Sequence, residues 1–149
     1  MKIDKSRWIQ EITLRTEARL NEILAAMELA NDSLVNDTKS SMGDKYETSR
    51  EMAQQELTRL QQQLKQVEND LATLQLLPTE SNNIVAMGSL VVTNQFNYLI
   101  SISIGQVKFE EEVLMVISKE SPIGKLLLGK SRGDQITFNG NEINIIDLL

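Results

Sequence analysis

The sequence predicts an α+β protein, with a long antiparallel helical hairpin over residues 1–77 and a small antiparallel β-sheet domain with one short helix over residues 78–149. Three observations support this division: a change in composition at Pro78, a heptad seam before it, and short β-rich runs after it. Residues 1–77 contain no Pro and one Gly, whereas residues 78–149 hold both Pro and six of the seven Gly. The first region is also rich in Gln, Glu, Leu, Ala and Arg, which favour helices.

Two apolar stripes separated by a turn predict the hairpin. The second stripe alternates steps of three and four residues, which is the heptad pattern of helices packed lengthwise; it consists of Leu57, Leu60, Leu64, Val67, Leu71 and Leu74. The first stripe has a polar gap near Thr16 and Arg19 and consists of Trp8, Ile12, Ile23, Met27, Ala30 and Leu34. Turn-forming residues between the stripes place the hairpin tip near residues 36–47. Each arm is about 45 Å long at 1.5 Å per residue, so the hairpin carries its tip far from its base.

Short runs rich in β-branched and aromatic residues predict the sheet, and they cover Leu90–Val92, Tyr98–Ile104 and Val113–Ile117. Asn139-Gly140 separates two further runs and is a strong signal for a two-residue β-hairpin turn. The acidic run at residues 110–112 is interpreted as a solvated turn beside a strand.

One short helix is predicted within the sheet region. Ser121 can cap it, Pro122 suits its first position, residues 123–128 fill it and Gly129 ends it. The Ser-Pro pair and Ile123 are therefore explained first by helix formation, and docking of a partner near them is the second interpretation.

Composition excludes several classes of function. The chain has no Cys and no His, which excludes structural zinc, disulfides, thiol nucleophiles and Ser-His triads. Any metal would have oxygen ligands, which favours magnesium or calcium. The net charge of −6 disfavours independent binding to DNA, because neutralising phosphates requires basic surfaces. Without an apolar signal core or a run of membrane-spanning length, we expect a soluble cytoplasmic protein with no membrane association.

Two carboxylates at the hairpin tip are the candidate chemical groups. Asp44 and Glu47 are three residues apart and face the same way if the second helix begins there. Such a pair can hold a magnesium ion while waters fill the remaining positions. The same spacing is also a capping box, in which the two residues satisfy backbone N–H groups at the helix start. Tyr46 lies between them and could contact a partner or a base, or cover the end of the hairpin.

Two stretches resemble the Gre family of transcription elongation factors. The longer is Ser121-Pro122-Ile123-Gly124-Lys125-Leu126-Leu127-Leu128-Gly129-Lys130 followed by Gly133-Asp134, which is similar to a run in the C-terminal domain of that family. The shorter is Gly43-Asp44 with Glu47, which matches the Gly-Asp-x-x-Glu of the family's hairpin tip. The chain departs from the family after the second acid, where Thr48-Ser49-Arg50 follows, and its aromatic residue lies inside the acid pair.

The resemblance implies a specific mode of action. The C-terminal domain, FKBP-like in fold, would dock at the rim of the secondary channel of bacterial RNA polymerase, with Ser121, Pro122 and Ile123 as candidate partner contacts. Tyr46 is a further candidate partner contact, at the hairpin tip. Asp44 and Glu47 would lie beside the catalytic Mg²⁺ and the 3′ end of the nascent RNA, where they would help the polymerase to cleave backtracked transcripts. The protein itself would then be a monomeric cofactor and not an enzyme, with no cofactor of its own.

Three alternatives remain open at this stage. A regulator could occupy the secondary channel without stimulating cleavage, which the altered tip residues favour. A prolyl isomerase is suggested only by the FKBP-like fold, and fold alone does not confer function. A coiled-coil adaptor with no polymerase role would form a long parallel dimer.

Overall fold

The computed structural model describes residues 3–37 and 43–149, without the side chains of residues 36, 37 and 43–46. Its elements are α1 (Lys5–Asp37), α2 (Gly43–Gln75), β1 (Leu90–Thr93), β2 (Asn97–Ile100), β3 (Gly105–Phe109), β4 (Glu112–Ile117), α3 (Pro122–Leu127), β5 (Gln135–Phe138) and β6 (Asn141–Leu148). The chain divides into two compact units, Ile12–Ala72 and Met1–Glu11 with Thr73–Leu149. The predicted α+β class is confirmed, while the domain boundary after residue 77 stays a prediction.

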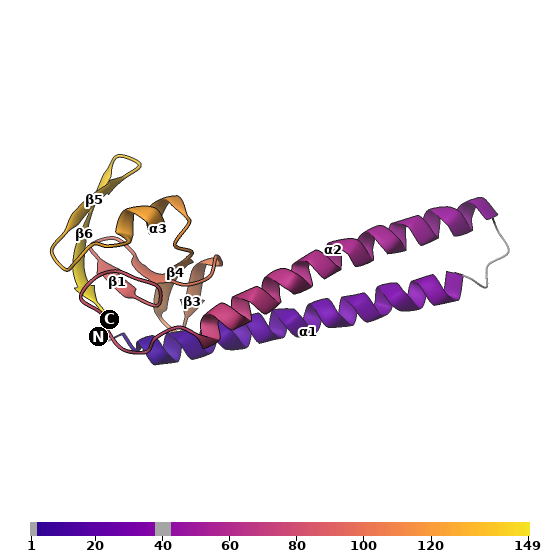
Figure 1. The fold of residues 1–149 in the computed structure, drawn as a ribbon, viewed down its shortest axis with the longest axis horizontal. Coiled ribbons are helices and arrows are strands. Elements are labelled where there is room, and N and C mark those ends of the chain that lie inside the picture. Colours follow the sequence, from indigo (N-terminus) through magenta and orange to yellow (C-terminus); the bar gives the residue numbers. More distant parts are fainter. Residues whose placement is uncertain (1–2, 38–42) are drawn as a thin grey trace. The chain divides into compact units, whose positions relative to one another are not determined.

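The unit Ile12–Ala72 is an antiparallel hairpin of two long helices (Figure 1). α1 and α2 each contain 33 residues, as the two apolar stripes predicted. The seam between them contains a cluster in which Ile23, Leu60 and Val67 are buried. The partly buried residues packed against this cluster are Leu20, Ala26, Met27, Leu64 and Leu71. The heptad positions of α2 are therefore used within the chain itself.

Thr16 accounts for the polar gap in the first stripe. Its side chain is buried, and its hydroxyl donates to the carbonyl oxygen of Ile12 at 2.8 Å. A hydroxyl that bonds back to the preceding turn satisfies its own polar group, so it can occupy a seam position without an unpaired donor. The gap is thus a self-satisfied position within a continuous helix.

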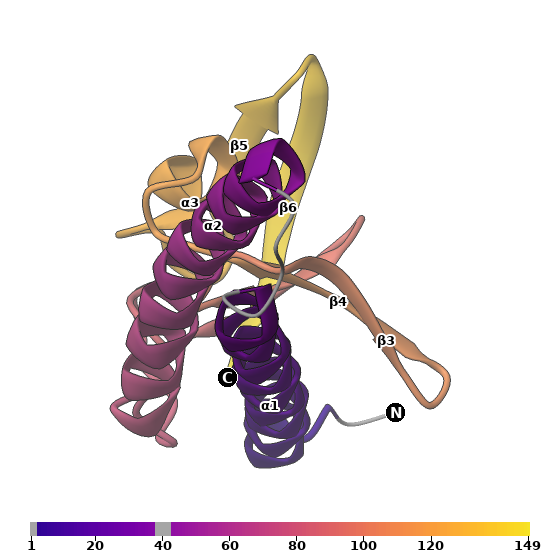
Figure 2. The ribbon, with the colours of Figure 1, turned by 90° about the vertical axis from the view of Figure 1, so that its right-hand side faces the viewer.

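The second unit contains a six-stranded sheet in the order β3-β4-β2-β1-β6-β5. Figure 2 shows the neighbouring strands β3 and β4, and β5 and β6. The sheet was expected to be antiparallel, but one pair, β2 with β4, is parallel. The chain leaves β2, forms β3 at the sheet edge and returns as β4 in the position between them. Two reversals of direction make β4 parallel to β2, and β3 itself was missing from the sequence-based prediction.

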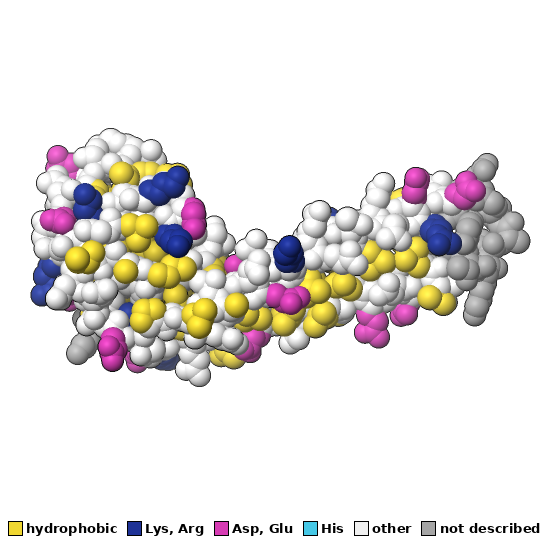
Figure 3. All heavy atoms as spheres, viewed as in Figure 1, with side chains coloured by type: hydrophobic (Ala, Val, Ile, Leu, Met, Phe, Trp, Pro, Cys, Tyr) yellow, Lys and Arg dark blue, Asp and Glu magenta, His cyan; other side chains and the backbone are white. Residues whose placement is uncertain are grey.

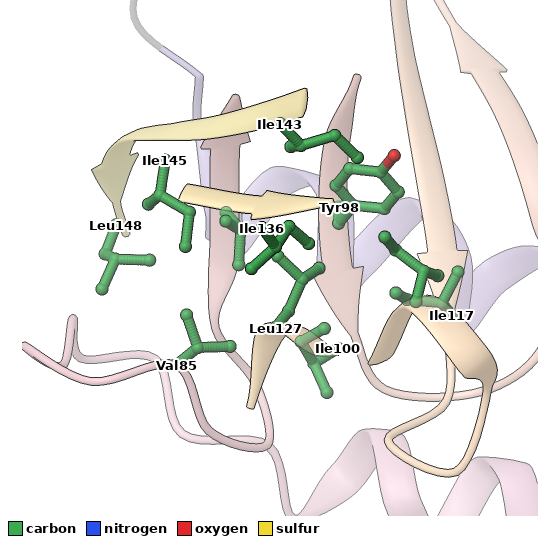
Figure 4. Close-up of a cluster of buried hydrophobic side chains, with 11 residues drawn as sticks. Val85, Tyr98, Ile100, Ile117, Leu127, Ile136, Ile143, Ile145 and Leu148 are labelled. Atoms are coloured by element: carbon green, nitrogen blue, oxygen red, sulfur yellow. The ribbon is translucent and has the colours of Figure 1, made fainter. Parts of the chain in front are cut away.

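One hydrophobic cluster fills the space between α3 and the sheet (Figure 4). Leu127 of α3 is fully buried there, and side chains of every strand except β3 point toward it. The buried members are Val85, Val91, Tyr98, Ile100, Ile117, Ile123, Leu127, Ile136, Ile143, Ile145 and Leu148. The cluster holds α3 and its preceding Ser-Pro pair in a fixed place on the sheet.

Two tight turns follow the predicted chemistry. Asn139 and Gly140 both have positive φ, at 51° and 80°, as a type I′ hairpin turn requires, and Phe138 pairs with Asn141 across it. Glu110 also has positive φ, at 57°, in the two-residue turn between Phe109 and Glu112. Glu110 and Glu111 of the acidic run therefore form the β3–β4 connection, while Glu112 is the first residue of β4.

Candidate functional site

The candidate acid pair lies at the beginning of α2. The helix starts at Gly43, so Asp44 and Glu47 both have helical backbone and are separated by one turn. Glu47 is exposed to solvent, whereas the side chains of Asp44 and Tyr46 lie outside the described residues. The distance between the carboxylates and the capping interaction of Asp44 therefore stay predictions.

Further carboxylates accompany Glu47 on the part of the hairpin near its tip. Glu28, Asp32 and Glu51 are exposed, and Figure 3 shows acidic side chains on both edges of this part of the hairpin. Among the side chains that the structure describes, which do not include those of Asp37 and Asp44, no group of three or more acidic residues could hold a metal ion. The described carboxylates near the tip offer oxygen donors, which suit Mg²⁺.

The outer surface of α2 behind the tip carries mostly solvated polar groups. Arg59 donates to Glu56 one helical turn away, and this hydrogen bond lowers the pKa of the Glu56 carboxyl and raises that of the guanidinium. Gln66 donates to Asp70 in the same way at 2.9 Å. Such exposed pairs one turn apart add modest support to a helix, so the seam supplies most of the stiffness of the arm.

The structure explains Ser121, Pro122 and Ile123 through the formation of α3. The Ser121 hydroxyl accepts from the backbone N–H of Gly124 at 3.0 Å and donates to the carbonyl oxygen of Ser118 at 2.7 Å. Pro122 occupies the first helical position, where no N–H is needed, and its side chain is exposed. Ile123 is only 8% exposed within the hydrophobic cluster. Of these three residues, Pro122 offers the largest surface to a partner.

Gly124 is required in this motif for steric reasons. A Cβ atom at this position would lie 2.2 Å from the carbonyl oxygen of Ser118 and 2.8 Å from the hydroxyl of Ser121. The exposed side chains of α3 are those of Pro122, Lys125 and Leu126, of which Leu126 is 38% exposed. Their spacing of three and four residues places them on one face of the helix, which we call the α3 surface.

A contact network at the start of α1 was not predicted from the sequence. Trp8 is 2% exposed, and its indole N–H donates to the Glu112 carboxylate at 2.7 Å. The Trp8 and Phe109 rings pack edge to face, with their centroids 5.6 Å apart. The guanidinium of Arg7 lies over the Phe109 ring and pairs with Glu110. The sequence contained one signal for this network, a single Trp near the start of the first helix. If such an indole is buried, its N–H requires a hydrogen-bond acceptor from another part of the chain.

Lys5 is a second buried polar residue at the start of α1. Its ammonium donates to the backbone oxygens of Glu80 at 3.1 Å and Leu149 at 3.2 Å. Burial lowers the pKa of this amine. Lys5 therefore fixes the first turn of α1 to two segments of the sheet unit.

The aromatic residues of the sheet unit do not converge on one pocket. Phe96 is exposed, Phe109 packs against Trp8, and Tyr98 and Phe138 belong to the hydrophobic cluster under α3. A site for an apolar ligand requires aromatic walls around one cavity, so this arrangement gives no support to prolyl isomerase activity.

In the part of the chain that the structure describes, neither long helix is apolar enough to span a bilayer.

Comparisons with known proteins gave matches only among solved structures. No family profile and no curated protein sequence matched the chain. The chain is similar to GreA factor homolog 1 (Gfh1) of Thermus thermophilus at 23% identity and a TM-score of 0.39, with 92% of this chain and 94% of that chain covered. A structure titled transcription factor Gfh1 is 21% identical with a TM-score of 0.35, and the match covers 99% of this chain and 94% of that chain. Thermus aquaticus Gfh1 is 16% identical with a TM-score of 0.35, and the match covers 97% of this chain and 94% of that chain. These similarities are distant, and none of them assigns a function to this chain.

Proposed function

We propose that this protein binds bacterial RNA polymerase at its secondary channel and stimulates cleavage of backtracked transcripts. The observation that carries the proposal is the position of Asp44 and Glu47 in the first two turns of a 33-residue helix, at the tip of a hairpin. A helix of this length extends for about 50 Å, which suits the delivery of a small acidic group into a narrow passage. The Ser121–Lys130 motif, which resembles the Gre C-terminal domain, supports the same assignment.

The proposed role of the acid pair is to supply oxygen ligands and orient water. Mg²⁺ at the polymerase active centre would supply the Lewis acid for phosphodiester hydrolysis. Asp44 and Glu47 would each offer a carboxylate oxygen to it and accept a hydrogen bond from the attacking water. On this proposal the chain is a cofactor of the polymerase and not itself an enzyme.

The α3 surface is the proposed docking contact. Pro122 and Leu126 offer exposed apolar area, and Lys125 adds a positive charge beside them. The Ser121 cap and the burial of Ile123 hold this face rigid, which limits the entropy lost on binding. Docking through the sheet unit and chemistry through the tip would then be separable by mutation.

Transcript cleavage by backtracked RNA polymerase from the same source, with Mg²⁺, tests the proposal. Wild-type protein is expected to accelerate RNA shortening, whereas Asp44→Ala with Glu47→Ala should abolish acceleration and leave polymerase binding intact. Glu28→Ala is the matched control, because it removes an exposed carboxylate from the same hairpin outside the acid pair. Loss of binding by a folded double mutant would contradict the separate roles of tip and docking surface.

A channel regulator that does not stimulate cleavage is the second candidate. Its support is the sequence after the second acid, where Thr48-Ser49-Arg50 departs from the family pattern. Competition for the channel without faster cleavage by the wild-type protein would favour it. A coiled-coil adaptor is less consistent with the structure, because Leu60 and Val67 pack against Ile23 within the same chain.

A further inference from the structure

A small pocket lies beside Trp8 in the sheet unit and has no role in the proposed function. Its volume is about 220 Å³, and it is lined by Ile3, Trp8, Asn97, Glu112, Val113 and Leu114. Sites for drug-sized ligands are usually about 300–1,000 Å³, so this pocket is of a size for one side chain. Among the described residues that line it, one carboxylate, that of Glu112, is the charged group.

The carboxylate of Glu112 is held in position before any ligand arrives. The indole N–H of Trp8 donates to its Oε2 atom at 2.7 Å, and Trp8 is itself fixed by edge contact with Phe109. A carboxylate has about four acceptor positions, so this hydrogen bond leaves the other oxygen and further lone pairs for a donor. The basic residue next to Trp8, Arg7, pairs with Glu110 and lies over Phe109, and it is not among the residues that line the pocket.

The remaining walls match the other parts of a long basic side chain. Ile3 and Val113 supply apolar surface for a methylene stem, while Trp8 and Leu114 line the pocket as almost fully buried residues, at 2% and 1% exposed. Asn97 adds a side-chain amide whose oxygen can accept a second hydrogen bond. Two acceptors on different walls suit the planar fork of a guanidinium better than the single point charge of an ammonium.

We propose that this pocket receives an arginine side chain from a protein partner, with Glu112 pairing with its guanidinium. Glu111, which precedes Glu112 in the chain and is exposed, adds a second negative charge that favours the approach of a basic segment. The chain thus has a binding site for a basic peptide that is separate from both the acid pair and the α3 surface. This inference stands or falls independently of polymerase binding, since it rests on residues that the proposed function does not use.

Trp8 is the only tryptophan of the chain, and it provides the assay. The full-length protein is titrated with N-acetyl-arginine methylamide while Trp8 emission is followed. Saturable binding with a Kd of about 1–10 mM is expected for so small a ligand. N-acetyl-citrulline methylamide, which has nearly the same shape without the charge, should bind at least about tenfold more weakly because it lacks the charge-assisted hydrogen bond. N-acetyl-lysine methylamide is the arm that tests the preference for arginine.

Two variants assign the effect to the pocket. Glu112→Gln keeps an oxygen for the Trp8 N–H but removes the charge, and it should weaken arginine binding about tenfold. Glu111→Gln removes the same charge from the exposed neighbour and should change binding by less than about twofold. The proposal is overturned if no saturable change occurs, if citrulline binds equally well, or if the two variants behave alike. Binding of lysine as tight as that of arginine would overturn the assignment to a guanidinium.

Discussion

Substitution of Gly124 by alanine reverses the usual effect of that change in a helix. At an ordinary helical position, Gly→Ala stabilises a protein by about 0.5–1 kcal/mol. At Gly124 the new Cβ would lie 2.2 Å from the carbonyl oxygen of Ser118, which belongs to the backbone and cannot rotate away. It would also lie 2.8 Å from the Ser121 hydroxyl, which accepts the backbone N–H of residue 124. The change therefore strains the backbone and the helix cap together.

The magnitude follows from three terms. Overpacking costs about 1–3 kcal/mol, and loss of the Ser121 cap costs about 0.5–2 kcal/mol. The gain in helix propensity offsets up to about 1 kcal/mol of this cost. We expect Gly124→Ala to lower the free energy of unfolding by about 0.5–5 kcal/mol. Ser121→Ala removes only the cap and should lower it by about 1 kcal/mol.

Urea unfolding of the full-length chain, followed by Trp8 fluorescence, measures these differences, because Trp8 and α3 belong to the same compact unit. Lys125→Ala is the control, since this exposed position in α3 should stay within about 0.5 kcal/mol of wild type. A Gly124→Ala variant as stable as wild type, or more stable, would refute the steric reasoning. Such a result would mean that the loop before α3 yields to the new methyl group at little cost.

Three further predictions concern other parts of the molecule. Burial raises the pKa of Tyr98, so its contribution to stability is present below about pH 10 and is lost as pH rises through the raised pKa. As the pH rises through this range, the free energy of unfolding of Tyr98→Phe should increase relative to that of wild type by up to about 1.4 kcal/mol per pH unit, measured by urea unfolding. Val67→Ala should destabilise the hairpin by about 1.5–3 kcal/mol in thermal melts followed by circular dichroism, because the side chain is fully buried in the seam. Asp44→Asn alone should slow transcript cleavage at least about tenfold without weakening polymerase binding.

Each of these predictions has an internal control. The lowered pKa of Lys5 acts in the opposite direction, with stability lost as pH falls through it, but wild type and Tyr98→Phe share this residue, so it cancels in their difference. A pH-independent difference would contradict the assignment to Tyr98. Lys65→Ala, at an exposed position of α2, should be nearly neutral beside Val67→Ala. Equal rates for Asp44→Asn and wild type would remove Asp44 from the proposed chemistry.

Local patterns predicted the elements whose cause is local. The heptad seam predicted both long helices, and Ser121 with Pro122 predicted the start of α3. Asn139-Gly140 predicted a turn that requires positive φ at both residues. In each case the signal lies within a few residues of the structure that it determines, so no knowledge of the rest of the fold was needed.

Features that depend on distant residues were not predictable in the same way. The strand β3 was missed because Gly105 and the alternating Gln106 and Lys108 carry a weak strand signal at a sheet edge. The parallel pairing of β2 with β4 depends on where that edge strand lies, which the sequence pattern does not specify. The hydrogen bond from Trp8 to Glu112 joins residues 104 positions apart. The acid pair was located on its helix by spacing, and its side-chain geometry stays a prediction.

Because residues 3–11 pack with residues 73–149, the sheet unit cannot be completed until residue 149 has left the ribosome. Lys5 and Trp8 are synthesised before the groups that they contact, at residues 80, 112 and 149. Helices form within about a microsecond, so the intervening hairpin can assemble while synthesis continues. Once formed, it replaces a flexible connection across residues 12–72 and removes much of the entropy cost of joining the two ends of the sheet unit. We therefore expect the hairpin to speed the folding of the sheet unit, because it brings together the two chain segments from which that unit is built.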